Sequence, residues 1–141
     1  PLDSFLARSP DERGKPKVLA GRMKKPYRHL IPEALQKVRQ HMGKPYDPVY
    51  KLEDGRYYCS ELLYEAFKAA NNQQPVFSLA PMTFKDPKTG RIFPAWQEYF
   101  RKMNQMVPQG KPGLNPGGMS QSEKIKIVHH FGYPENYNPK P

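Results

Sequence analysis

The segment Tyr57-Tyr58-Cys59-Ser60-Glu61-Leu62 contains the chain's single cysteine and leads into a stretch whose apolar residues have helical spacing. They share one face of a helix that ends at Asn71-Asn72, and they are Leu62, Leu63, Ala66, Phe67 and Ala70. Cys59 therefore falls at or just before the first turn of this helix.

This placement suits a reactive thiol. A helix N-terminus presents unpaired backbone N–H groups and the positive end of its dipole, which favour the thiolate form of a cysteine. The same N–H groups can bind the oxyanion that forms during acyl transfer. A cysteine before an apolar helical face is also often a small buried hydrophobe, so spacing alone leaves a structural interpretation open.

Two further helices are predicted along the chain. The first spans 32–42, where Pro32 suits the first helical position and Gly43 suits the stop. The second spans 94–106, and we interpret its aromatic stripe as core; the stripe consists of Trp96, Tyr99, Phe100 and Met103.

Short strands and loops account for the rest of the chain. Strands are predicted at 17–21 and 124–128. Irregular segments are rich in proline, glycine or turn residues, and they are 44–48, 54–55, 86–90, 107–118 and 132–141. The segment 107–118 is interpreted as a long loop or lid.

The composition fits one globular domain. The chain has 141 residues, 37% of them hydrophobic, and a formal charge of +10. This charge predicts a solvated basic surface, an anionic cell surface or an acidic substrate as partner. Nucleic acid is disfavoured, because no zinc-finger, helix-turn-helix or RNA-binding sheet signature accompanies the charge.

Several protein classes are excluded by simple counts. A single cysteine forms neither an internal disulfide nor a thiolate zinc cluster. No apolar stretch approaches the roughly 20 residues that span a bilayer, and no signal peptide precedes Pro1. The opening Pro-Leu-Asp-Ser-Phe does not suit a native start, so we expect residues upstream.

The sequence motifs around the cysteine resemble those of a known family. Two segments together resemble the nucleophile region of NlpC-type peptidases within the papain fold. The first is Gly43-Lys44-Pro45-Tyr46, and the second, about a dozen residues later, is 58–67. The form Tyr-Cys-Ser-Glu-Leu is more similar to the YiiX-like, circularly permuted branch, which is related in architecture to lecithin:retinol acyltransferase. The resemblance extends to 1–6 and to 115–120 with the strand after it.

This resemblance implies an α+β, papain-like permuted fold for residues 1–141, with the nucleophile helix packed on a small antiparallel sheet and an N-terminal part missing. It implies a bacterial thiol hydrolase that cleaves an amide (peptide, cell-wall peptide or N-acyl) or ester bond through a cysteine acyl-enzyme. Neither a metal nor an organic cofactor is implied. The cell envelope or secretion is the implied location.

The resemblance also assigns roles to five residues. Cys59 is the nucleophile, Tyr46 and Tyr58 are cleft-wall residues, and Ser60 and Glu61 begin the nucleophile helix beside the substrate cleft. From the residues alone, the two tyrosines can equally be packed aromatics. Ser60 and Glu61 can simply favour a helix start, because a hydroxyl caps it and a carboxylate suits the dipole.

A nucleophilic cysteine needs a base, usually histidine. In the permuted branch this histidine precedes the cysteine on a strand, so an upstream segment of the same domain is expected to supply it. His29 and His41 are predicted on the surface. His129 and His130 follow the strand at 124–128, in the Cys-then-His order of the unpermuted peptidases. Strand alternation predicts that one of them points inward, which makes it the alternative candidate for the base.

A second functional hypothesis is a non-catalytic binding module for an anionic polymer. Its basic surface and proline- and glycine-rich loops would grip the polymer, and its binding would depend steeply on salt. A third makes Cys59 a buried structural residue.

Overall fold

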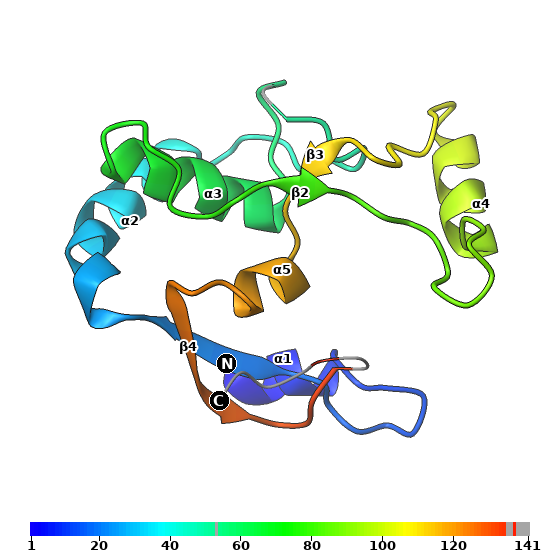
Figure 1. Ribbon diagram of the computed structural model, residues 1–141, viewed down its shortest axis with the longest axis horizontal. Helices are drawn as coiled ribbons and strands as arrows, with labels where there is room; N and C mark the ends of the chain where they lie inside the picture. The colour runs from blue at the N-terminus through cyan, green and yellow to red at the C-terminus, as the bar shows by residue number, and fades with distance from the viewer. Residues whose placement is uncertain (53, 135–136, 138–141) are drawn as a thin grey trace. The chain divides into compact units, whose positions relative to one another are not determined.

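The computed structural model describes residues 1–52, 54–134 and 137 (Figure 1). The described chain forms two compact units, and each is described here by itself. The first contains the two ends of the chain, Pro1–His29 and Pro116–Pro141, and the second is the continuous stretch Leu30–Asn115. Residues 135–136 and 138–141 of the predicted irregular tail lie outside the described residues.

The first unit is built around a two-stranded antiparallel sheet. Its elements in chain order are α1 (Leu2–Ala7), β1 (Leu19–Met23), most of the 3-10 helix η1 (Lys25–Leu30), α5 (Pro116–Ser120) and β4 (Ile125–His130). In Figure 1, β1 (blue) and β4 (orange) lie side by side. Both predicted strands exist, but β1 begins two residues later than predicted because the Lys17 N–H donates to the Ser9 carbonyl in the preceding turn.

The prediction that His129 or His130 points inward is wrong, since both are exposed. Ala20 pairs with His129 while Gly21 pairs with Ile127, so Val128 forms a bulge that interrupts the alternation of the strand. Gly21 is required beside this bulge, because a Cβ there would lie 2.8 Å from the Ile125 side chain.

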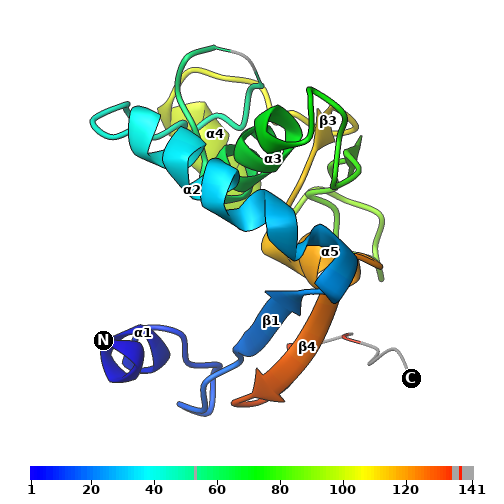
Figure 2. The same ribbon diagram turned by 90° about the vertical axis from the view of Figure 1, so that its left-hand side faces the viewer.

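Three α-helices dominate the second unit: α2 (Ile31–Gln40), α3 (Cys59–Ala70) and α4 (Pro94–Lys102). Figure 2 shows α2 lying alongside α3, against which it packs. The helix predicted from the cysteine segment starts at Cys59 and ends at Ala70, before Asn71, as expected. The helix predicted at 94–106 is longer than α4, which ends at Lys102, because Asn104 takes a left-handed conformation just beyond that end.

A second short antiparallel pair joins β2 (Ala80–Pro81) to β3 (Pro112–Gly113) in this unit. The predicted irregular segment 107–118 therefore contains a strand. A Cβ at Gly113 would lie 2.5 Å from the Met82 sulfur, so a larger residue there would require the Met82 side chain to move. The predicted turn at 86–90 is confirmed, since the Gly90 N–H donates to the Asp86 carbonyl at 2.8 Å and Gly90 has a positive φ.

The core of the second unit is aromatic. Phe100 is fully buried and packs edge-on against Phe84 and Tyr99, with ring centroids 5.8 and 5.3 Å away. Trp96 lies in the same cluster, 5.2 Å from Phe84, as the predicted stripe requires. Leu63, predicted on the buried face of α3, is 40% exposed, because α3 buries Ser60 and Glu61 instead.

Candidate functional site around Cys59

Cys59 is the first residue of α3, and its thiol is exposed. The residue before it, Tyr58, is extended (φ −89°, ψ 163°), so the chain enters the helix sharply at the cysteine. The third hypothesis, a buried structural cysteine, is therefore wrong. An exposed thiol at the start of a 12-residue helix has free access to a substrate and lies beside the first-turn N–H groups.

The start of α3 is fixed by buried polar groups. The Glu61 carboxylate accepts a hydrogen bond from the Tyr58 N–H at 3.3 Å, which reaches back over the first turn. The Ser60 hydroxyl donates to the Leu114 carbonyl at 2.7 Å, and the Leu114 N–H donates to the Tyr58 hydroxyl at 3.4 Å. The backbone of Leu114 thus clamps the helix start.

These contacts define what the predicted cleft residues do. Tyr58, Ser60 and Glu61 are each at most 2% exposed, and their side chains bind groups of the protein. Ser60 and Glu61 begin the helix, as predicted. Their contact with a substrate, and that of Tyr58, stays a prediction. Tyr46 is 58% exposed, as a residue on a cleft wall would be.

The loop before the helix is shaped by a buried aspartate, which the sequence analysis did not assign to the site. Asp47 is fully buried, and its carboxylate accepts hydrogen bonds from the Val49 and Lys51 N–H groups. Its own N–H donates to the Tyr57 carbonyl at 3.2 Å, which ties the loop to the residue two before Cys59. Aspartate between two prolines, in Pro45-Tyr46-Asp47-Pro48, is the local signal for this turn.

Tyr50 is the second residue that sequence reasoning missed. Its φ of 56° lies in the left-handed region, which costs a bulky residue about 1 to 3 kcal/mol. The Asp47 carboxylate binds the N–H groups on either side of it, at Val49 and Lys51, and thereby holds this conformation. Unusual backbone of this kind is often found at functional sites.

Three tyrosines of this region have raised pKa values. Burial raises the pKa of Tyr46, Tyr50 and Tyr58, and the charge of Cys59 raises each of them further. The pKa of Tyr50 rises to about 12. All three phenols are therefore neutral hydrogen-bonding groups at physiological pH.

The raised pKa of Tyr50 predicts a loss of stability at alkaline pH. Above the usual pKa of 10, the unfolded state loses the Tyr50 proton while the folded state keeps it up to about 12. Because the unfolded state then binds fewer protons, the contribution of Tyr50 to the free energy of unfolding is fully present below pH 10. It falls as the pH rises to 12. We expect urea unfolding midpoints at pH 8 and pH 11 to differ less in Tyr50→Phe than in the unmodified protein. Tyr133→Phe, at an exposed ring, should keep the full difference; an unchanged difference in Tyr50→Phe would disprove this effect.

His41 is less exposed than predicted. It follows α2, and its ring lies 4.5 Å from the Tyr57 ring, which leaves it half-buried. Its Nδ1 atom is buried and has no hydrogen-bond partner among the described residues. Tertiary packing against Tyr57, which helical periodicity does not reveal, explains the difference.

A base for the thiol is not identified among the described residues. None of the four histidines forms a hydrogen bond with Cys59 there, and His29 is exposed as predicted. His129 and His130 belong to the first unit, whereas Cys59 belongs to the second. Their role as a base stays a prediction.

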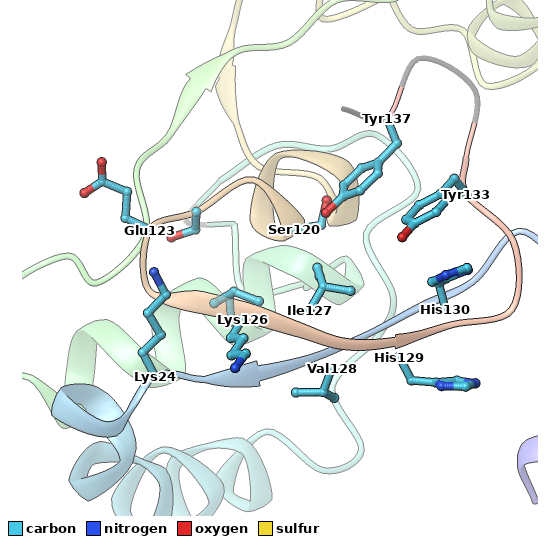
Figure 3. Close-up of a pocket in the computed structure, with 12 residues that line it drawn as sticks. Lys24, Ser120, Glu123, Lys126, Ile127, Val128, His129, His130, Tyr133 and Tyr137 are labelled. Carbon is cyan, nitrogen blue, oxygen red and sulfur yellow. The ribbon is translucent and has the colours of Figure 1, made fainter. Parts of the chain in front are cut away.

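The first unit has a groove of its own, with a volume of about 730 Å³. A stack of rings lies along it: His130 is 4.1 Å from Tyr133, and Tyr133 is 5.5 Å from Tyr137. Lys24 and Lys126 also line it, and neither forms an ion pair with a described carboxylate. Figure 3 shows the side chains of His130, Tyr133, Tyr137 and Ser120 on one side of β4, and those of Lys126, Val128 and His129 on the other.

Two further properties concern possible ligands and membranes. Within residues 1–52, 54–134 and 137, no three His, Cys, Asp or Glu side chains are grouped so that they could hold a metal ion. Among the same residues, no helix has the length and apolar character needed to cross a membrane.

Comparison with known proteins supports the fold. Residues 1–129 match the family model described as permuted papain-like amidase enzymes of the YaeF/YiiX, C92 family. A similar solved structure is the metalloprotein YiiX from Escherichia coli O157:H7, with a TM-score of 0.66 and 20% identity over 95% of this chain and 70% of that one. The predicted α+β, permuted papain-like fold is therefore confirmed. No curated protein matches this chain.

Proposed function

Because this chain belongs to the permuted papain-like amidases of the YaeF/YiiX, C92 family, we propose that it hydrolyses an amide bond through a covalent intermediate on Cys59. The family is one of cysteine hydrolases of the amidase kind and implies a peptide or amide substrate. The observation that carries the proposal is the exposed thiol of Cys59 at the start of α3. A cell-wall peptide or an N-acyl amide is the substrate class that we favour, with an ester as a second class.

The chemistry would run in two steps. In the first, the thiolate of Cys59 attacks the carbonyl carbon, a C–S bond forms, and the C–N bond breaks as the amine leaves with a proton from the base. In the second, the base takes a proton from water, whose oxygen attacks the thioester and releases the acid and the thiolate. The N–H groups of the first turn of α3 would stabilise the oxyanion in both steps.

We propose that the base is a histidine of an upstream segment. In the permuted order this histidine precedes the cysteine on a strand, whereas His29 lies in a 3-10 helix and His41 follows α2. Replacing both His129 and His130 with glutamine is therefore expected to leave the acylation rate of Cys59 unchanged. A loss of about 100-fold or more in that variant would instead identify one of them as the base.

Alkylation of Cys59 by iodoacetamide tests the accessibility of the thiol without any substrate. We expect the folded protein to react at pH 7 at least as fast as a urea-unfolded control, because the thiol is exposed at the start of α3. Intact-mass spectrometry measures one added carbamidomethyl group, and the single cysteine makes the site unambiguous. A folded thiol that reacts more slowly than the unfolded one would contradict the proposal.

The groove of the first unit favours a second candidate function, the binding of an anionic polymer. Its lining has two lysines, two histidines and the single carboxylate of Glu123. Dextran sulfate is a suitable probe: its binding should weaken steeply between 50 and 200 mM salt and should be unaffected by Cys59→Ala. At a fixed salt concentration, the double variant Lys24→Ala with Lys126→Ala should bind dextran sulfate more weakly than the unmodified protein. Lys102→Ala, at an exposed lysine of the second unit, is the matched control and should bind it as the unmodified protein does. Equal binding by all variants would exclude the groove.

A further inference from the structure

We propose that Asp47 is a positioning residue of the Cys59 site, whose buried carboxylate folds the loop that fixes how the chain enters α3. The inference rests on the proposed function, since it concerns the same thiol. Asp47 acts through the backbone of Tyr57, which lies two residues before the cysteine.

The carboxylate of Asp47 is fully buried, which is costly unless hydrogen bonds satisfy its oxygens. Each oxygen accepts a backbone N–H: Oδ1 accepts that of Val49 at 2.8 Å, and Oδ2 accepts that of Lys51. These two bonds close a turn around Tyr50 and hold its backbone in the left-handed region, at φ 56°. Loss of the carboxylate would therefore release this turn.

The start of the turn is paired with the segment that leads to the thiol. The Asp47 N–H donates to the Tyr57 carbonyl, and the Tyr57 N–H donates to the Pro45 carbonyl, both at 3.2 Å. Tyr46, between these two bonds, forms a parallel bridge with Tyr57. Tyr58 follows in an extended conformation, and α3 begins at the next residue. The turn made by Asp47 therefore sets the position of the backbone from which the helix starts.

The far side of the turn is attached to the aromatic cluster of the second unit. The Tyr99 hydroxyl donates to the Pro48 carbonyl at 3.0 Å. The Tyr50 ring meets the rings of Tyr58 and Trp96 edge-on, with centroids 5.3 and 6.1 Å away. The turn thus links this cluster to the start of α3, and the Asp47 carboxylate keeps the link rigid.

The orientation of the helix start matters for acyl transfer but not for alkylation. Attack on an acyl group needs the Cys59 sulfur aligned with the carbonyl carbon and the first-turn N–H groups of α3 aimed at the oxyanion. Alkylation by iodoacetamide forms no oxyanion, so its rate reports whether the thiol can be reached and ionised. A positioning role therefore predicts that loss of the Asp47 carboxylate slows acylation and leaves alkylation unchanged.

Asp47→Asn tests this role, because the amide keeps the shape and one acceptor oxygen and places an NH₂ group against a backbone N–H in place of the other. The readout is acylation of Cys59 by p-nitrophenyl acetate at pH 8, in which a C–S bond forms, the ester C–O bond breaks and one p-nitrophenolate is released. We expect this burst to slow about 10-fold and alkylation to stay within about 2-fold of the unmodified protein. Asp47→Ala, which loses both acceptors, should slow the burst further.

Asp86→Asn is the matched control. Asp86 also precedes a proline, and its carboxylate accepts a backbone N–H from Lys88 at 2.7 Å in the turn at 86–90. Both rates in this variant should stay within about 2-fold of those of the unmodified protein. Urea unfolding midpoints of all variants confirm that each rate is measured on folded protein.

The outcomes separate this inference from the function on which it rests. A burst in the unmodified protein that Asp47→Asn leaves unchanged would overturn the positioning role alone. So would an equal loss in Asp86→Asn, or a parallel fall of acylation and alkylation in Asp47→Asn, which would indicate a thiol that had become inaccessible. No burst in the unmodified protein would overturn the proposed function and this inference together.

Discussion

Cys59→Ala is expected to abolish amide hydrolysis, with a loss of at least about 10³-fold, while the fold stays intact. The nucleophile forms the covalent intermediate, and the hydroxyl of the adjacent Ser60 does not replace it, because it is buried and donates to the Leu114 carbonyl. Because the thiol is exposed and alanine favours helices, the free energy of unfolding should change by no more than about 0.5 kcal/mol.

Two measurements check this expectation. Release of p-nitroaniline from N-acetyl-alanine p-nitroanilide follows hydrolysis, and a urea unfolding midpoint follows stability. Cys59→Ser serves as the comparison, since it keeps the shape of the side chain with a weaker nucleophile and should also be inactive. Hydrolysis that survives in Cys59→Ala would exclude the thiol mechanism.

Phe100→Ala is expected to destabilise the protein by about 3 to 5 kcal/mol. The ring is fully buried in α4 and contacts Phe84, Tyr99 and Tyr50, so its removal leaves a cavity under the aromatic cluster. This loss is a large fraction of the roughly 5 to 15 kcal/mol by which native domains are stable. Urea unfolding at pH 7 measures it.

The same substitution at an exposed ring is the matched control. Phe93 lies just before α4 and is 42% exposed, so Phe93→Ala should cost well under half as much. Equal losses at the two positions would show that Phe100 does not anchor the cluster.

Local signals predicted the nucleophile helix well. The apolar spacing after Cys59 and the acidic residue three positions after Tyr58 both act within one or two turns, so the start and end of α3 could be read directly. The same is true of the aromatic stripe on α4. The orientation of α3 was not predictable in this way, because its buried Ser60 is satisfied by Leu114, 54 residues further along.

In the candidate site, too, local sequence predicted some residues, while others depend on distant contacts. Cys59 and Tyr46 could be named from short motifs, but Tyr50 and Asp47 could not. Their positions depend on how a proline-containing loop folds against the distant rings of Phe84, Trp96 and Phe100. The bulge at Val128 was likewise hidden, because it depends on the pairing of β4 with the far end of the chain.

The pairing of β1 with β4 has a consequence for synthesis on the ribosome. β1 ends at Met23 and β4 begins at Ile125, so the first strand leaves the ribosome about 100 residues before its partner. At about 5 to 20 residues per second, this delay is on the order of 5 to 20 s. The continuous stretch Leu30–Asn115 emerges wholly within that interval. The nascent chain is thus expected to fold its thiol-bearing unit before β4 pairs with β1.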